Sequence, residues 1–384
     1  MPKPGLDTEV ACCADVLESS GHDAPAPPAE GVLMQSSARG DVVDEALNAC
    51  QVGVVVLGRA DAGRLRQDLE QPQEVPFISS SALTVGQGCL AADELLNLAH
   101  SSEIVFALSF AGLSGNRSAF SEAAARASAA PGVADVAARL RGMLPDEGFA
   151  ASRIQDPYAL RVFAITHGAV VTALARLTEQ LTGVLNAAQE NPLFDIAGQT
   201  VVHHGAFYQA ALALEVDGLN LALAQSSTIT HARVRMMNEP AQTGLEPFLA
   251  AGPPGSSGVM MIEYVAAGAV AEIRNAAQPA SLGTLALSRG AEEDATFTAQ
   301  AVVQLERAIA AYRVLLSSEL LCAVRLLRQL GRTRTLPDAL SAAFDLCDRL
   351  PSEWEDRDLR DDLDTADELL DELASLPEQL TSRG

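Results

Sequence analysis

Beyond residue 132, hydrophobic positions recur every three or four residues over most of the chain, which is the spacing of one face of a helix. The longest such pattern predicts a helix over 292–330, roughly 55 Å long at about 1.5 Å rise per residue. The apolar positions along its face are Val302, Leu305, Ile309, Tyr312, Leu316, Leu320, Val324 and Leu327.

The same spacing predicts a chain that is almost wholly helical. Thr200–His204 is the only short strand-like candidate, and Ser114–Pro131 is expected to be a loop that contains a helical turn. Long helices pack best as an elongated antiparallel bundle, so we expect an all-α fold of this kind. The predicted helices cover 7–20, 42–58, 78–113, 133–144, 157–189, 208–237, 258–285, 292–330, 336–349 and 358–375.

Three segments are expected from this pattern: an N-terminal segment over 1–75, a central long-helix bundle with the substrate pocket over 76–349, and an acidic helical segment over 350–384. Residues 353–378 carry twelve acidic side chains and two arginines. This segment is interpreted as the solvated face of a terminal helical hairpin, with a surface for a basic partner as the alternative.

The overall charge argues against two classes of partner. The chain has 26 Lys and Arg and 50 Asp and Glu residues, which gives 26 − 50 = −24. Such a charge opposes binding to nucleic acid and to anionic membranes, so neither partner is expected.

The only lysine is Lys3, which argues against Schiff-base chemistry, a pyridoxal phosphate anchor and a P-loop. The six cysteines form no CxxC pair and are interpreted as buried reduced thiols of a cytoplasmic protein. Neither a signal peptide nor an apolar run of about 18 residues is evident, so a cytoplasmic location without a membrane span is expected.

Several candidate functional residues lie in one short stretch, Gln155-Asp156-Pro157-Tyr158-Ala159-Leu160-Arg161. Asp156 suits an N-cap and Pro157 the first helical position, so a helix is expected to begin here. Tyr158 and Arg161 would then share a face, with an arginine beside the positive helix end, which is a site for a carboxylate or another anion. The alternative is structural: the arginine pairs with a nearby acid and the tyrosine packs in the core.

An ordered set of motifs extends this stretch along the chain and resembles the aromatic amino-acid ammonia-lyases, histidine ammonia-lyase most of all. The resemblance covers roughly residues 30–384. The motifs are Gln155–Arg161, Asn191-Pro192-Leu193-Phe194, Gly205-Ala206-Phe207-Tyr208, Gly244–Leu249, Ser257–Met260, Gln278–Ser281 and Glu292–Asp294.

The resemblance implies an all-α homotetramer whose pockets combine residues of several subunits. Family members make an electrophilic methylidene-imidazolone ring from an internal Ala-Ser-Gly, and a tyrosine takes the β-proton of the substrate. By this likeness Arg161 would hold the substrate carboxylate, and Gln155 and Tyr158 would line the site. Phe207 would pack beside the reacting centre and Glu293 would lie near the amino group.

The departure from the family lies at the ring itself. The matching position has the sequence Ala38-Arg39-Gly40-Asp41, and no Ala-Ser-Gly occurs in the chain. Because the methylidene carbon comes from a serine side chain that loses water, an arginine cannot supply it. Ser79 stands where the family has an asparagine, His204-Gly205-Ala206 replaces Gly-Gly-Asn, and the family's N-terminal loop with its catalytic tyrosine has no counterpart.

His203 and His204 leave two interpretations open. His204 could act as a base near neutral pH, or both side chains could make structural hydrogen bonds in a loop. A metal site would need a third ligand such as Glu293 or Asp294, which the spacing alone does not indicate, so no metal is expected.

Two functions follow from these residues. The first is an enzyme without the ring and without another cofactor, which performs elimination, conjugate addition, isomerisation or cyclisation on a carboxylate or amino-acid-derived substrate, in specialised metabolism. Tyr158, Glu293 and His204 are its candidate catalytic residues. The second is a non-catalytic homologue, or one chain of a split ammonia-lyase. The candidate substrate-binding residues are Arg161, Gln155, Phe207, Ser79 and Arg39.

Overall fold

The computed structural model describes residues 81–144, 151–187, 189, 191–195 and 197–376. The predicted helices over 7–20 and 42–58 and the candidate residues Arg39 and Ser79 lie outside these ranges.

The chain divides into two compact units. Unit 1 comprises Met1–Leu90 and Glu179–Gln209, and unit 2 comprises Ala91–Thr178 and Ala210–Gly384. Two long helices therefore have residues in both units. These are α5 (Ala82–Gly112) and α9 (Phe163–Leu185).

A two-stranded hairpin lies in unit 1. Strand β1 (Leu193–Asp195) pairs antiparallel with β2 (Thr200–Val202), with Leu193 opposite Val202. Asp195 accepts a hydrogen bond from the backbone N–H of Gly198 at 2.9 Å, which closes the turn between the strands. The prediction of a strand at 200–204 is confirmed for its first three residues, whereas β1 was not predicted.

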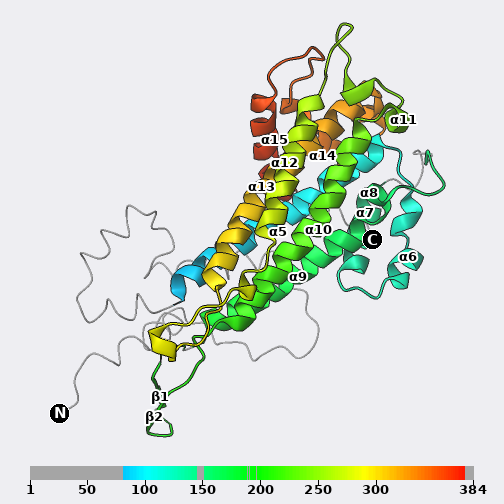
Figure 1. Ribbon diagram of the computed structural model, residues 1–384. Coiled ribbons are helices and arrows are strands. Elements are labelled where there is room, and N and C mark those ends of the chain that lie inside the picture. The colour runs from blue at the N-terminus through cyan, green and yellow to red at the C-terminus, as the bar shows by residue number, and fades with distance from the viewer. Residues whose placement is uncertain (1–80, 145–150, 188, 190, 196, 377–384) are drawn as a thin grey trace. The chain divides into compact units, whose positions relative to one another are not determined.

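Unit 2 is a bundle of long helices, which confirms the all-α prediction. The central helix is α13 (Thr298–Gln329), which packs against α10 (Ala210–Met237), α12 (Met260–Ala276) and α15 (Arg360–Ala374). Figure 1 shows α10, α12 and α13 running side by side. With 32 residues, α13 is about 48 Å long at ~1.5 Å per residue.

The apolar stripe of α13 explains its central place. All eight positions that predicted this helix expose 1% of their surface or less. Burial of a leucine or isoleucine side chain contributes about 1.5–3 kcal/mol, so this stripe supplies much of the stability of the bundle. The helix begins six residues later than predicted because Phe297 has a φ of 53°, in the left-handed region that does not continue a helix.

Short helices connect the long ones. The region 114–131, predicted as a loop with a helical turn, contains two of them, and the helix predicted over 258–285 already ends at Ala276, ahead of Pro279. The remaining elements are η1 (Arg117–Phe120), α6 (Glu122–Ala127), α7 (Val133–Met143), α8 (Tyr158–Arg161), α11 (Pro240–Thr243), η2 (Pro247–Leu249), η3 (Ala280–Leu282), η4 (Ser288–Gly290), η5 (Arg332–Thr335), α14 (Asp338–Leu346) and η6 (Cys347–Arg349).

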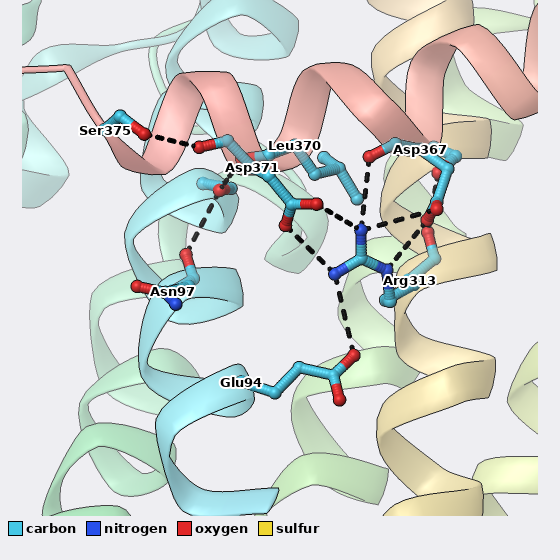
Figure 2. A network of polar contacts seen from close by, with 9 residues as sticks. Glu94, Asn97, Arg313, Asp367, Leu370, Asp371 and Ser375 are labelled. Atoms are coloured by element: carbon cyan, nitrogen blue, oxygen red, sulfur yellow. Dashed lines mark hydrogen bonds and ion pairs between the residues drawn. The ribbon is translucent and has the colours of Figure 1, made fainter. Parts of the chain in front are cut away.

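The acidic helix α15 is attached to the central helix of the bundle by an arginine of α13. Arg313 of α13 forms ion pairs with Asp367 at 2.9 Å and Asp371 at 3.0 Å, and Glu94 lies 3.6 Å from its guanidinium (Figure 2). Beside it, Ser101 of α5 donates a hydrogen bond to the carbonyl of Leu370 at 2.6 Å. The remaining acids of α15 are mostly exposed, as predicted for a solvated face.

By length and composition, α5 is the one helix of the described residues that could cross a membrane, with a mean hydropathy of 1.2 over its most apolar window. In the structure 83% of that window is buried within the protein. Such burial is typical of a core helix, and the length test alone does not distinguish the two cases.

Candidate functional site

The turn that carries Tyr158 and Arg161 is held from its N-terminal side by Asp156. The Asp156 carboxylate accepts a hydrogen bond from the backbone N–H of Asn116 at 2.5 Å and pairs with Arg153 at 2.8 Å. The prediction that Asp156 is the helix N-cap is therefore wrong. Its oxygens are occupied by partners outside the helix, and Pro157 takes the cap position without a side-chain hydrogen bond.

The helix predicted over 157–189 is divided in two. Helix α8 ends at Arg161, Val162 departs from helical geometry with φ −103° and ψ 6°, and α9 then runs to Leu185. The division leaves Tyr158 and Arg161 on a four-residue turn of their own.

Tyr158 and Arg161 lie against each other on this turn, as their spacing of three residues predicts. The guanidinium carbon of Arg161 lies 4.6 Å from the centroid of the Tyr158 ring, and Tyr158 is 63% exposed. Among the described residues, no carboxylate pairs with Arg161 and its buried Nε has no hydrogen-bond partner. The structural alternative, an arginine paired with an acid beside a buried tyrosine, is not observed in these residues.

The other candidates of unit 2 are Gln155 and Glu293, both on the surface. Gln155 is exposed just before α8, and Glu293 is exposed in the loop after η4. Within the described part of the chain, no hydrogen bond or ion pair links Glu293 to Tyr158 or Arg161. Glu293 is therefore a candidate from the resemblance alone.

His204 and Phe207 belong to unit 1. The His204 Nδ1 atom accepts a hydrogen bond from the backbone N–H of Ala206 at 3.0 Å, and the backbone N–H of His204 donates to the side-chain oxygen of Asn191 at 3.0 Å. The Phe207 ring is half exposed, 6.5 Å from the His204 ring. These bonds support the structural interpretation of His204, although the partner of its ring is an N–H group rather than a carbonyl.

Two cavities among the described residues of unit 2 have volumes of about 10 and 30 Å³, and neither is lined by Tyr158 or Arg161. In the same part of the chain, no three His, Cys, Asp or Glu side chains gather in a way that could hold a metal ion.

Comparison with known proteins places this geometry in a family. The family model described as aromatic amino acid lyase matches residues 59–348. The chain belongs to the aromatic amino acid lyase family. The motifs that suggested ammonia-lyases therefore indicated the correct family.

The curated relatives that this family member matches are longer. Histidine ammonia-lyase of Halalkalibacterium halodurans is 32% identical over 270 residues, which are 69% of this chain and 53% of that protein. The chain thus spans about half the length of the curated relatives it matches.

Solved structures show the same fold. Histidine ammonia-lyase from Trypanosoma cruzi superposes with a TM-score of 0.74 at 23% identity, over 84% of this chain and 64% of that one. A tyrosine aminomutase from Streptomyces globisporus gives 0.73 at 25% identity, over 81% and 65%.

Two buried charge pairs in this family member were not expected from the sequence. Arg233 of α10 and Glu319 of α13 are both completely buried and paired at 2.6 Å. Glu103 of α5, also buried, binds Arg139 through two short bonds of 2.6 and 2.7 Å. The available signal was a charged residue within a long apolar run, because such a residue is buried only when it is paired.

Proposed function

We propose that this protein binds a small carboxylate through Arg161 and acts on it by acid/base chemistry, without the ring electrophile of its relatives. The observation that carries the proposal is the half-buried guanidinium of Arg161, which has no acid partner among the described residues and lies against the exposed ring of Tyr158. A partly desolvated cation without a counter-ion is stabilised by an incoming carboxylate, which a guanidinium can bind through two parallel hydrogen bonds.

The sequence supports the absence of the ring. Arg39 stands where the ring-forming serine is expected, in a region outside the described residues, and an arginine side chain has no hydroxyl group to lose. Without an electron sink, loss of ammonia from an unactivated amino acid is not expected. The substrate would instead carry its own activating carbonyl, next to which a proton can be removed.

In this proposal Tyr158 is the acid/base residue that would carry the proton, and Glu293 would assist it. Arg161 would orient the carboxylate relative to the tyrosine oxygen, so that elimination, conjugate addition, isomerisation or cyclisation becomes possible. An intact mass lower by two waters, or release of ammonia from histidine or phenylalanine, would contradict the ring-free mechanism.

Removal of Arg161 tests the proposal. The probe is whichever carboxylate raises the melting temperature most in a panel of amino acids and unsaturated aryl carboxylates. The Arg161→Ala variant is expected to bind it at least about 30-fold more weakly in calorimetry, since a hydrogen-bonded charge pair is worth about 2–3 kcal/mol. Arg126→Ala is the control, because Arg126 is an exposed arginine already paired with Glu122. Unchanged affinity in Arg161→Ala would reject the anion site.

We also propose that the chain assembles into the homotetramer implied by its family. Support comes from the outward face of α10 between residues 211 and 225, whose exposed positions carry no charge in a protein of charge −24. Leu214 and Leu221 on this face are 61% and 51% exposed. The face repeats at three and four residues, the spacing of a helix–helix seam, through Ala211, Leu214, Gly218, Leu221 and Gln225.

A charge placed on this seam is expected to dissociate the assembly. Leu221→Asp should sediment as a smaller species than the wild-type protein, because the buried carboxylate would lack a partner. Ala123→Asp, at an exposed position of α6, adds the same charge away from α10 and should leave the sedimentation unchanged. Identical behaviour of the Leu221→Asp variant and the wild type would show that the seam is not an interface.

A second candidate function rests on coverage, because the chain spans about half the length of the curated relatives it matches. In this alternative the chain is a non-catalytic homologue or one part of a split lyase, and a second chain completes the site. Copurification of a second chain in a constant one-to-one ratio from the native host would favour it.

A further inference from the structure

A buried ion pair lies directly behind the α8 turn. Arg233 and Glu319 expose none of their surface, and they meet through two parallel bonds, from Nε to Oε1 at 2.6 Å and from Nη2 to Oε2 at 2.8 Å. Ser109 donates a further hydrogen bond to Glu319 at 2.8 Å, and Thr230 accepts one from Arg233 at 3.0 Å. Since a guanidinium is planar, these bonds fix its orientation as well as its position.

The remaining nitrogen of Arg233 reaches α8. Its Nη1 donates to the carbonyl of Ala159 at 3.2 Å, and Ala159 lies between Tyr158 and Arg161. The guanidinium carbon also lies 5.1 Å from the centroid of the Phe163 ring, and Phe163 is the first residue of α9. One buried side chain thus contacts the turn itself and the helix that follows it.

Few local interactions stabilise the α8 turn. Helix α8 has four residues, its cap residue Pro157 makes no side-chain hydrogen bond, and Val162 separates it from α9. Isolated helices of this length are unstable, so the position of such a turn is set by its tertiary contacts.

We propose that Arg233, oriented by Glu319, is a positioning residue that sets the Tyr158–Arg161 pair for ligand binding. The inference rests on the proposed function of Arg161, and it assigns to the buried pair a role beyond stabilising the core. The two bonds to Glu319 fix the plane of the guanidinium, and Nη1 transmits that orientation to the Ala159 carbonyl. A displacement of this carbonyl moves the two flanking side chains together.

Arg233→Lys separates charge from geometry. A lysine keeps the ion pair with Glu319, but its single nitrogen cannot hold two parallel bonds to Glu319 and also reach Ala159. The matched control is Arg139→Lys. Arg139 makes the same two parallel bonds, 2.7 and 2.6 Å long, to the buried Glu103 of α5.

We expect Arg233→Lys to weaken binding of the carboxylate probe about tenfold at a temperature where all variants are folded, while Arg139→Lys changes it less than twofold. Amide hydrogen exchange should also be faster across 158–162 in Arg233→Lys than in Arg139→Lys. A merely structural role would lower the melting temperature of both variants without this difference in affinity and local exchange.

Equal affinities of the two lysine variants would overturn the inference. If Arg233→Lys does not fold, Glu319→Asp decides in the same way, because it keeps both charges and shortens the side chain that orients Arg233 by one methylene.

The Arg161→Ala result separates the two proposals. If that variant binds normally, the proposed function fails. If it binds weakly while both Arg233→Lys and Glu319→Asp bind normally, only the positioning role fails.

Discussion

Replacing Phe106 with alanine is expected to lower the free energy of unfolding of unit 2 by about 4 kcal/mol, within the range for a fully buried phenylalanine. The Phe106 ring is completely buried and lies parallel to the Phe163 ring at 4.0 Å between centroids. The edge of Phe120 meets it at 5.6 Å, and the guanidinium of Arg233 lies 5.0 Å from its centroid. The variant loses buried area, ring contacts and a cation–π contact together.

Urea unfolding followed by helical circular dichroism measures this loss, with the transition of unit 2 fitted separately because a chain of two units need not unfold in one step. Tyr264→Ala is the control, because the Tyr264 side chain of α12 also belongs to unit 2, is 66% exposed, and its loss should cost less than about 1 kcal/mol. A loss below about 1.5 kcal/mol for Phe106→Ala would mean that the neighbouring rings close the cavity.

Hydrophobic spacing predicted the long helices because their packing faces are long and regular. The stripe of α13 extends over seven turns, so a few misleading residues cannot hide its period. The helix ends were less predictable, because they depend on single residues. Phe297 takes a left-handed backbone conformation that is unusual for phenylalanine, so its residue type gave no signal of a helix start. Val162 interrupts a helix although it is neither a glycine nor a proline.

The side-chain contacts that the sequence did not predict are those with partners far away along the chain. Asp156 is of a residue type that is common at helix N-caps, but its carboxylate accepts a hydrogen bond from the backbone N–H of Asn116, forty residues earlier. The pairing of Arg233 with Glu319 joins residues 86 positions apart, which no local pattern indicates. The contact of Tyr158 with Arg161 was predictable because both residues are on one turn.

Several part-buried arginines of the described residues bind backbone carbonyl groups. Arg325 donates to the carbonyl of Leu249 at 3.0 Å and to that of Trp354 at 2.9 Å, tying two loops to α13. Arg332 donates to the carbonyls of Ala111 and Gly112, at the C-terminal end of α5. The last carbonyls of a helix accept no hydrogen bond from within that helix. A guanidinium can donate hydrogen bonds to several carbonyls at once, which the single ammonium group of a lysine cannot do with the same geometry.

Glu103→Gln is expected to lower the free energy of unfolding by about 3 kcal/mol at pH 7. Burial of Glu103 by itself would raise the pKa of its carboxyl group, but the hydrogen bonds and charge of Arg139, together with the neighbouring His167 ring, outweigh burial and lower the pKa from 4.5 to about 2. The difference of about 2.5 pKa units corresponds to about 3 kcal/mol at 1.36 kcal/mol per unit. The carboxylate is 3% exposed, so solvent screening reduces this value little.

The sign of the pH dependence follows from the lowered pKa of Glu103. The stabilisation is fully present above pH 4.5, where the carboxyl group is ionised in both states, and it is lost as the pH falls from 4.5 toward 2. The stability difference between wild type and Glu103→Gln should therefore be constant from pH 7 to about 5 and shrink below that. Urea unfolding at several pH values measures it, with Glu122→Gln, in the exposed pair with Arg126, expected to cost less than about 0.5 kcal/mol. A difference that stays constant down to pH 3 would show that the pKa of Glu103 is not lowered by its partners.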